Sequence, residues 1–167
     1  MPHKLAHAHA HQHHKHLPPA HVTAFISAHA AEAKIVAMKY NLPASAILAQ
    51  SALESKWGMK APGNAFFGVK GKSPAGTSVM IPTHEVLKGK VVAETDAFRS
   101  YDSWSSAADD YANVITTNKL FSGVLAHRTD PFQYAEAMGR SPYATGHQYG
   151  DLMKSIIKSY NLTQYDK

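Results

Sequence analysis

Cysteine is absent from the 167-residue chain, which excludes disulfide bonds, thiolate chemistry and cysteine-ligated metal sites. Long apolar runs are missing too: no stretch of about 18 apolar residues occurs, so we expect no transmembrane helix. The N-terminus has basic residues but no apolar h-region, and we therefore expect no secretory signal peptide. The sequence also lacks a Walker-type loop, a Rossmann fingerprint and a nucleophile elbow, which argues against the enzyme classes built on them.

The composition is that of one soluble globular domain, with 44% hydrophobic residues. Lysine and arginine outnumber aspartate and glutamate by 17 to 12, a formal net charge of +5. This excess favours polyanionic partners such as nucleic acid, anionic membranes or the acidic bacterial cell wall, or it serves only solubility. Without residues 1–19 the balance is 15 minus 12, or +3, with no basic cluster, so we expect neither a nucleic-acid nor a membrane partner.

Residues 1–19 form a histidine-rich segment that ends in Pro18-Pro19 and has almost nothing to bury. We interpret it as a disordered extension or an affinity tag, with a native metal-binding tract as the alternative, because imidazole suits Zn, Cu and Ni. Neither version is the active site. Seven of the twelve histidines lie here, namely His3, His7, His9, His11, His13, His14 and His16.

From Ala20 to Lys167 the pattern predicts one mainly α domain with a single inserted β-hairpin. The first helix should stop at Asn41, and the second should begin near Pro43, run to about Lys56 and be capped by Gly58. A glycine- and proline-rich loop over 59–78 follows, long enough to be functional. Further helices are predicted over 104–117, 120–127, 131–138 and 149–160.

The predicted hairpin covers residues 79–98 around the short turn Lys88-Gly89. A two-residue turn pairs Leu87 with Lys90, Glu85 with Val92, and Thr83 with Glu94. Glu85 and Glu94 then share one face of the hairpin as diagonal neighbours, where either could point into a cleft. Ordinary solvent exposure is the alternative for each of these charges. Pro82 indicates an edge strand.

Glu54 is the leading candidate for a catalytic group. On a helix it shares a partly apolar face with Ile47, Gln50 and Ser51, and it lies in the last turn, where the helix dipole is negative. Both effects raise the pKa of a carboxyl, and Trp57 could cover it. A carboxyl that keeps its proton is what a general acid in glycoside cleavage needs. The alternative is a solvated glutamate at the helix end beside Lys56.

Other polar and aromatic residues carry weaker signals. Asp109 and Asp110 are adjacent on a predicted helix, point about 100° apart and are interpreted as solvated. A zinc site built from the scattered histidines has no supporting spacing. Aromatic rings stack on sugar faces, although most of the rings are expected in the core. The candidates for sugar stacking are Trp57, Phe66, Phe67, Tyr101, Trp104, Tyr143 and Tyr149.

The run AILAQSALESKWG resembles the catalytic helix of glycoside hydrolase family 73, which contains the flagellar muramidase-like protein and the autolysin glucosaminidases. Four further segments match in the same order: NAFFGVKG, the T-H-E of the hairpin, FRSYDSWSSAADDYANVI and SPYATGHQYGDLMKSIIKSYNL. Together they cover about residues 22–162. The family's Y-A-T motif is often followed by aspartate, whereas Gly146 follows it here.

The resemblance implies a lysozyme-like α fold with a β-hairpin lobe lining the cleft. It also implies hydrolysis of the β-1,4 bond between N-acetylglucosamine and N-acetylmuramic acid in peptidoglycan. Glu54 matches the family's catalytic acid, Glu85 the second glutamate on the mobile hairpin lobe, and Tyr143 the tyrosine near the sugar. Asn64 and Phe67 match its N-x-F-G-like segment. Together with three of the aromatic candidates above, the expected substrate-binding residues are Trp57, Asn64, Phe67, Tyr101 and Tyr149.

In the expected mechanism Glu54 protonates the glycosidic oxygen. Either Glu85 then activates a water, or the substrate's 2-acetamido oxygen attacks, oriented by Tyr143. The alternative functions are a lytic transglycosylase and a non-catalytic cell-wall-binding module. No cofactor or metal is expected. The chain should be a monomer that acts on glycan strands in the periplasm or the extracellular wall. An inhibitor or immunity protein is a possible further partner. The sequence does not reveal the export route.

Overall fold

The structure is a computed structural model that describes residues 17–144, 146 and 148–167, and only the backbone of Glu85. The seven histidines of the N-terminal segment lie outside the described residues, as does His147. None of the helices in these described residues combines the length and the hydropathy that a membrane span requires.

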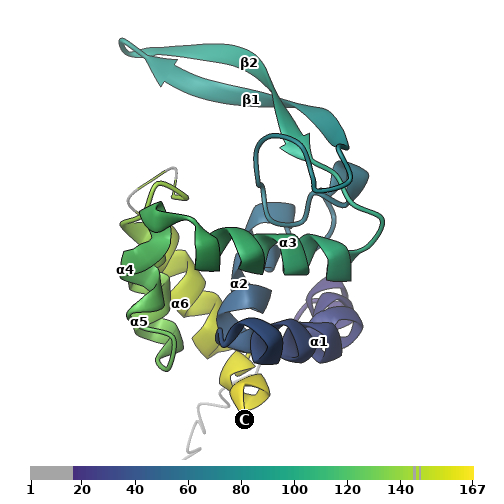
Figure 1. Cartoon of the computed structure of the whole chain (residues 1–167), viewed down its shortest axis with the longest axis vertical. Helices are drawn as coiled ribbons and strands as arrows, with labels where there is room; N and C mark the ends of the chain where they lie inside the picture. The colour runs from purple at the N-terminus through teal and green to yellow at the C-terminus, as the bar shows by residue number, and fades with distance from the viewer. Residues whose placement is uncertain (1–16, 145, 147) are drawn as a thin grey trace, which may run out of the picture.

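The described chain forms six α-helices and one antiparallel hairpin, which confirms the predicted mainly α fold (Figure 1). The hairpin stands at the top of the view, above α3 and the rest of the helical body. The α-helices are α1 (Ala20–Tyr40), α2 (Ala44–Ser55), α3 (Trp104–Thr117), α4 (Ser122–Leu125), α5 (Pro131–Gly139) and α6 (Tyr149–Ser159). Short 3₁₀ turns are η1 (Pro62–Asn64), η2 (Lys119–Phe121) and η3 (Leu162–Asp166), and the strands are β1 (Ser78–Leu87) and β2 (Lys90–Arg99).

Helix α2 runs through the centre of the molecule, and all of its residues except Leu53 and Glu54 are buried. Small side chains such as Ala46 and Ala49, both with no exposed surface, let the neighbouring helices approach its backbone closely. Its C-terminal end differs from the prediction. The cap is Lys56 in the left-handed conformation (φ 48°), and Trp57 and Gly58 also have positive φ. The chain therefore turns sharply directly after Glu54 and Ser55.

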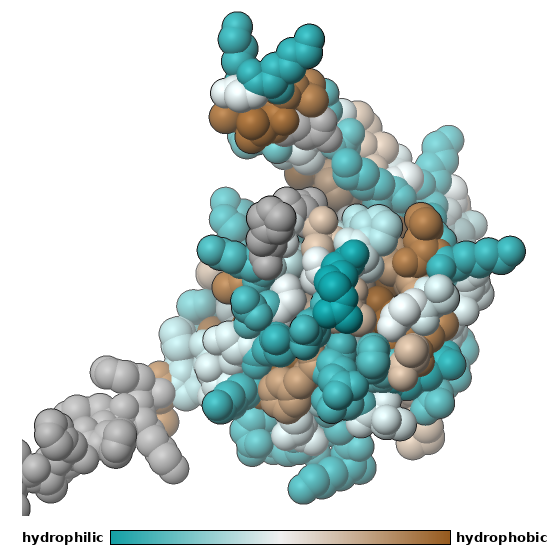
Figure 2. Space-filling model, turned by 90° about the vertical axis from the view of Figure 1, so that its left-hand side faces the viewer, coloured by the Kyte–Doolittle hydropathy of each residue, from teal (hydrophilic) through white to brown (hydrophobic). Residues whose placement is uncertain are grey.

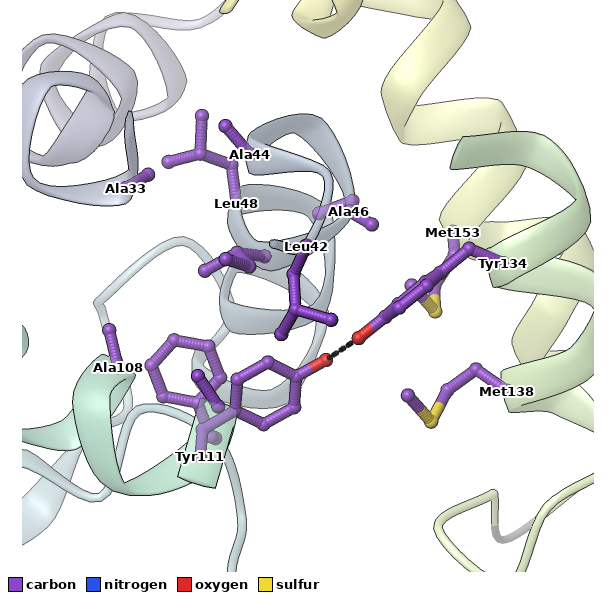
Figure 3. Packing of buried hydrophobic residues seen from close by; sticks show 14 of the residues in the cluster. Ala33, Leu42, Ala44, Ala46, Leu48, Ala108, Tyr111, Tyr134, Met138 and Met153 are labelled. Atoms are coloured by element: carbon purple, nitrogen blue, oxygen red, sulfur yellow. Dashed lines mark hydrogen bonds between the residues drawn. The ribbon is translucent and has the colours of Figure 1, made fainter. Parts of the chain in front are cut away.

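Several polar side chains inside the core form hydrogen bonds between helices. Tyr111 of α3 donates its hydroxyl proton to Oε1 of Gln50, and the Tyr111 and Tyr134 hydroxyls lie 2.9 Å apart (Figure 3). The indole Nε1 of Trp104 donates to Oγ of Ser51 over 2.8 Å. These bonds fix the rotation of α2, because they hold two of its side chains from outside the helix.

The hairpin has the predicted register, with Leu87 paired to Lys90 and Thr83 to Glu94. Both turn residues, Lys88 and Gly89, have positive φ, as the favoured two-residue turns require. The base is held by a short third segment, since Arg99 N donates to the Val69 carbonyl (2.8 Å) and Lys70 bridges to Phe98. The tip extends away from the body with exposed apolar side chains (Figure 2), among them Val86, Leu87 and Val91.

Helices α5 and α6 are in close contact at Gly139 and Gly150, and this contact leads to a first prediction. A Cβ on Gly139 would lie 2.8 Å from the backbone nitrogen of Gly150, so Gly139→Ala must force the two helices apart. We expect a loss of about 1–3 kcal/mol of stability, measured as a lower Tm in thermal unfolding. Gly123→Ala is the matched control, because a Cβ there meets nothing within 4 Å. An equal Tm for both variants would contradict the close contact.

Candidate active site

A cleft between the hairpin and the helical body passes over Glu54. It consists of two cavities of about 520 and 730 Å³, and Glu54, Gly68 and Phe98 line both of them. Because the cavities meet at one carboxyl, a polymer lying along the cleft would present its middle to Glu54. The first cavity also includes Lys70, Thr83, His84, Asp96, Arg99, Val114, Asn118, Phe121 and Tyr143. The second also includes Lys56, Met59, Lys60, Pro62 and Ile81.

The carboxyl of Glu54 is partly buried at the end of the central helix. Its Oε1 accepts a hydrogen bond of 2.9 Å from the hydroxyl of Tyr149. Burial raises the pKa of Glu54, and the bond from Tyr149 offsets part of that rise, because it stabilises the anion. The expected solvated alternative is therefore wrong, and the carboxyl has the environment that favours its protonated form.

Gly68 lies directly against this carboxyl. Its φ is +63°, and a Cβ at this position would be 2.6 Å from Oε2 of Glu54. The loop backbone can approach so closely only because glycine has no side chain and tolerates this conformation. Gly68 thus forms one wall around the acid. The segment NAFFG was singled out in the sequence, but for Asn64 and Phe67 rather than for its glycine.

Two tyrosines from the C-terminal part of the chain, Tyr143 and Tyr149, form hydrogen bonds at and beside Glu54. The hydroxyl of Tyr143, which lines the first cavity, donates to the backbone carbonyl of Phe67, next to Gly68. Burial raises the pKa of both tyrosines well above the ordinary value, so both hydroxyls keep their protons. Tyr149 is buried, with 8% of its surface exposed. The hydroxyl of Tyr149 donates to the carboxyl of Glu54, as described above.

Asp96 is a second carboxyl in the first cavity, and the sequence reasoning missed it. Its Oδ2 accepts from the hydroxyl of Thr83 (2.8 Å) and lies 3.3 Å from Nζ of Lys70. The hydrogen bond from Thr83 and the Lys70 ammonium hold the pKa of Asp96 below its usual value. The cleft therefore contains one carboxyl with a raised pKa and one with a lowered pKa. The sequence did contain a signal for Asp96. This residue lies two positions beyond Glu94 in the predicted hairpin and therefore on the same face.

Asp110 is buried, so the expectation that both members of the Asp109-Asp110 pair are solvated is wrong for this residue. Its carboxylate accepts from Arg99 at 3.1 Å and from the hydroxyl of Tyr101 at 2.5 Å. These bonds attach the end of β2 to α3. Asp109 instead forms a partly exposed ion pair with Lys39 at 2.7 Å.

Several predicted substrate-binding residues contact other protein groups in the structure. Trp57 packs edge-on against Phe25 and Tyr160 and does not line either cavity, so it does not provide the expected cover for Glu54. Asn64 donates from Nδ2 to the carbonyl of Tyr101 over 2.8 Å. Phe67 is 1% exposed and stacks on Tyr111 with ring centroids 4.6 Å apart.

Glu85 occupies the predicted register position in β1, opposite Val92, and its side chain lies outside the described part. Its neighbours show which face of the hairpin turns toward the body. Ile81 and Thr83 are half-buried, whereas Pro82 and His84 are exposed. Glu85 therefore belongs by alternation to the same strand face as Ile81 and Thr83. In the described residues no cluster of three or more His, Asp or Glu side chains is arranged to hold a metal ion.

Comparison with known proteins gives consistent matches. Residues 30–162 match the glucosaminidase family profile, described as mannosyl-glycoprotein endo-beta-N-acetylglucosaminidase. The chain is 36% identical over 152 residues to an autolysin of Enterococcus faecalis, covering 85% of this chain and 20% of the relative. It is 38% identical to a probable N-acetylmuramidase of Lactococcus lactis, covering 86% of this chain and 34% of the relative. It therefore spans about a fifth to a third of the length of these relatives.

A solved structure matches over nearly the whole chain. It is the catalytic domain of the autolysin Auto from Listeria monocytogenes, which superposes with a TM-score of 0.77 at 30% identity and covers 90% of each chain. The overall fold of this chain therefore also occurs in a solved catalytic domain.

Proposed function

This chain belongs to the glucosaminidase family, glycoside hydrolase family 73, and from that premise we propose that it cleaves the β-1,4 bond between N-acetylglucosamine and N-acetylmuramic acid in peptidoglycan, with Glu54 as general acid. The observation that supports this most directly is the position of Glu54. Its partly buried carboxyl, with a raised pKa, lines both cavities of an open cleft. The substrate lies in the cell wall, so the enzyme acts outside the cytoplasm.

The protonated carboxyl of Glu54 supplies a proton to the glycosidic oxygen as the bond to the anomeric carbon breaks. The hydroxyl of Tyr149 can stabilise the carboxylate that remains, because it already donates to Oε1 in the resting enzyme. Positive charge then develops at the anomeric carbon of the sugar. Either water attacks this carbon directly, or the substrate's acetamido oxygen attacks first and forms a cyclic oxazolinium ion that water then opens, so one water is consumed on both routes. Ionised Asp96 joins Glu85 as a candidate to stabilise that charge or to activate the water.

Product analysis tests the bond that is cut. The names of the two relatives differ, since one is an autolysin and the other a probable N-acetylmuramidase. Purified peptidoglycan is digested, the new ends are reduced with borohydride, and the fragments are identified by mass spectrometry. A reduced N-acetylglucosamine end supports the proposal, and a reduced N-acetylmuramic acid end contradicts it. Anhydro ends would indicate a lytic transglycosylase, and no fragments would indicate a wall-binding module.

A comparison of two carboxyl variants identifies the second group. We expect Glu85→Gln to lower the rate strongly, near the lower end of the 10²–10⁴-fold range for acid–base groups and less than the loss of Glu54. Asp96→Asn removes the competing carboxylate and its ion pair with Lys70. The measurement is the initial rate on soluble peptidoglycan for each variant. A larger loss in Asp96→Asn would assign the role to Asp96, and unchanged rates in both variants would favour the acetamide route.

A further inference from the structure

Two lysines line the second cavity and have no acidic partner in the described part of the chain. Lys56 and Lys60 line it together with Glu54, Met59, Pro62, Ile81 and Phe98, and neither forms an ion pair there. The first cavity is different, because its two long cations are already paired. Lys70 lies 3.3 Å from Asp96, and Arg99 lies 3.1 Å from Asp110.

The backbone holds these two lysines in a defined turn beside the acid. Lys60 N donates to the Ser55 carbonyl (2.9 Å), and Gly58 N donates to the Ser55 hydroxyl (2.9 Å). Lys56 itself is the left-handed cap of α2, two residues beyond Glu54. The backbone of both lysines therefore has a defined position along the cleft, and their exposed side chains extend from it.

Both lysines belong to the turn that follows α2, and both line the same cavity. The neighbouring Lys60 lowers the pKa of Lys56, which is the direction expected for like charges that repel each other. A bound carboxylate would remove this repulsion. The rest of the cavity lining is largely apolar, with Met59, Pro62, Ile81 and Phe98. The site thus suits a ligand with apolar groups and one or more carboxylates.

We propose that Lys56 and Lys60 bind the carboxylates of the acidic peptide attached to the muramic acid on one side of the cleaved bond. The inference rests on the proposed function, because the peptide reaches these lysines only when the glycan strand lies along the cleft. The stem peptide is thereby a recognised part of the substrate, and binding through solvent-exposed lysines lowers KM rather than raising kcat.

The test uses soluble peptidoglycan fragments free of other wall polymers, in two forms: with native stem carboxylates, and with those carboxylates converted to amides. On the native fragments we expect Lys56→Gln/Lys60→Gln to raise KM by roughly 3- to 10-fold with kcat unchanged, the size expected for two exposed ion pairs. Amidation should raise the KM of the parental enzyme to the same level and should leave the KM of the double variant unchanged.

Lys34→Gln/Lys158→Gln is the matched control. It removes the same charge from two exposed lysines that line neither cavity of the cleft, and its KM should stay at the parental value. Equal KM increases in both double variants would mean general attraction to an acidic substrate and would overturn the proposal. A parental enzyme that cuts native and amidated fragments with the same KM would also overturn it, while leaving the proposed function intact. If the parental enzyme cuts neither form, the proposed function itself fails.

Discussion

Glu54→Gln is expected to lower the rate of peptidoglycan hydrolysis by about 10²–10⁴-fold while the protein stays folded. Glutamine keeps the shape of the side chain and an oxygen that accepts from Tyr149, so the hydrogen bond of 2.9 Å has a replacement. Only the transferable proton is lost. The measurement is the release of reducing ends from peptidoglycan under conditions that saturate the parental enzyme. Glu32→Gln, on α1 and outside both cavities, is the control and should keep the parental rate.

The same variant should be at least as stable as the parental protein. Burial raises the pKa of Glu54 above its ordinary value of 4.5, so the folded state binds this proton more tightly than the unfolded chain. The parental protein therefore loses stability as the pH rises from about 4.5 through the folded-state pKa, and glutamine has no such loss. The difference in Tm between Glu54→Gln and the parental protein should therefore increase over this pH interval and stay constant at higher pH. A parental rate of hydrolysis in Glu54→Gln would refute the assignment.

Local sequence signals predicted the elements that depend on local chemistry. The hairpin register follows from the two-residue turn at Lys88-Gly89 and the alternation on either side, and the structure confirms it. The end of α1 at Asn41 follows from the tolerance of asparagine for the left-handed conformation, which the residue adopts with φ 54°. Each of these features is decided within a few residues, so one sequence suffices to predict it.

The site depends on contacts between residues far apart in the chain, and these were not predictable. Tyr149 lies 95 positions from Glu54, and its contact with the carboxyl arises from the packing of α6 on α2. Asp110 has the composition of a surface residue, but Arg99 and Tyr101 arrive from the end of the hairpin and satisfy it inside. A buried aspartate with two such partners is indistinguishable in sequence from an exposed one.

The roles of the aromatic residues were also difficult to predict from the sequence. Trp57, Phe67 and Tyr101 were all expected to contact sugar. Phe67 is 1% exposed and belongs to the core, whereas Trp57 and Tyr101 are half-buried, so a sugar contact by these two stays a prediction. An aromatic ring suits both a core and a cleft, so composition alone cannot separate the two uses. The loop over 59–78 contributes its backbone to the site at Gly68 more than its rings.

Gly68→Ala is expected to lower the hydrolysis rate by about 10- to 100-fold, although it adds only one methyl group. The new Cβ would lie 2.6 Å from Oε2 of Glu54 and 3.2 Å from its Cδ, so the carboxyl must rotate away from its present position. The carboxyl can move because it is the end of a flexible side chain, and the fold should survive. The measurement is kcat on soluble peptidoglycan, together with Tm.

The left-handed backbone itself also disfavours alanine, by roughly 1–2 kcal/mol, and this effect must be separated from the displaced acid. Gly76→Ala is the matched control, since Gly76 has φ +81° in the same loop and a Cβ there meets nothing within 4 Å. It should lose stability and keep its activity. In a protein that already carries Glu54→Ala, Gly68→Ala should cost no more stability than Gly76→Ala, because the contacted carboxyl is gone. If Gly68→Ala instead keeps the parental kcat, the loop does not fix the acid, and the position of Glu54 must be held by Tyr149 alone.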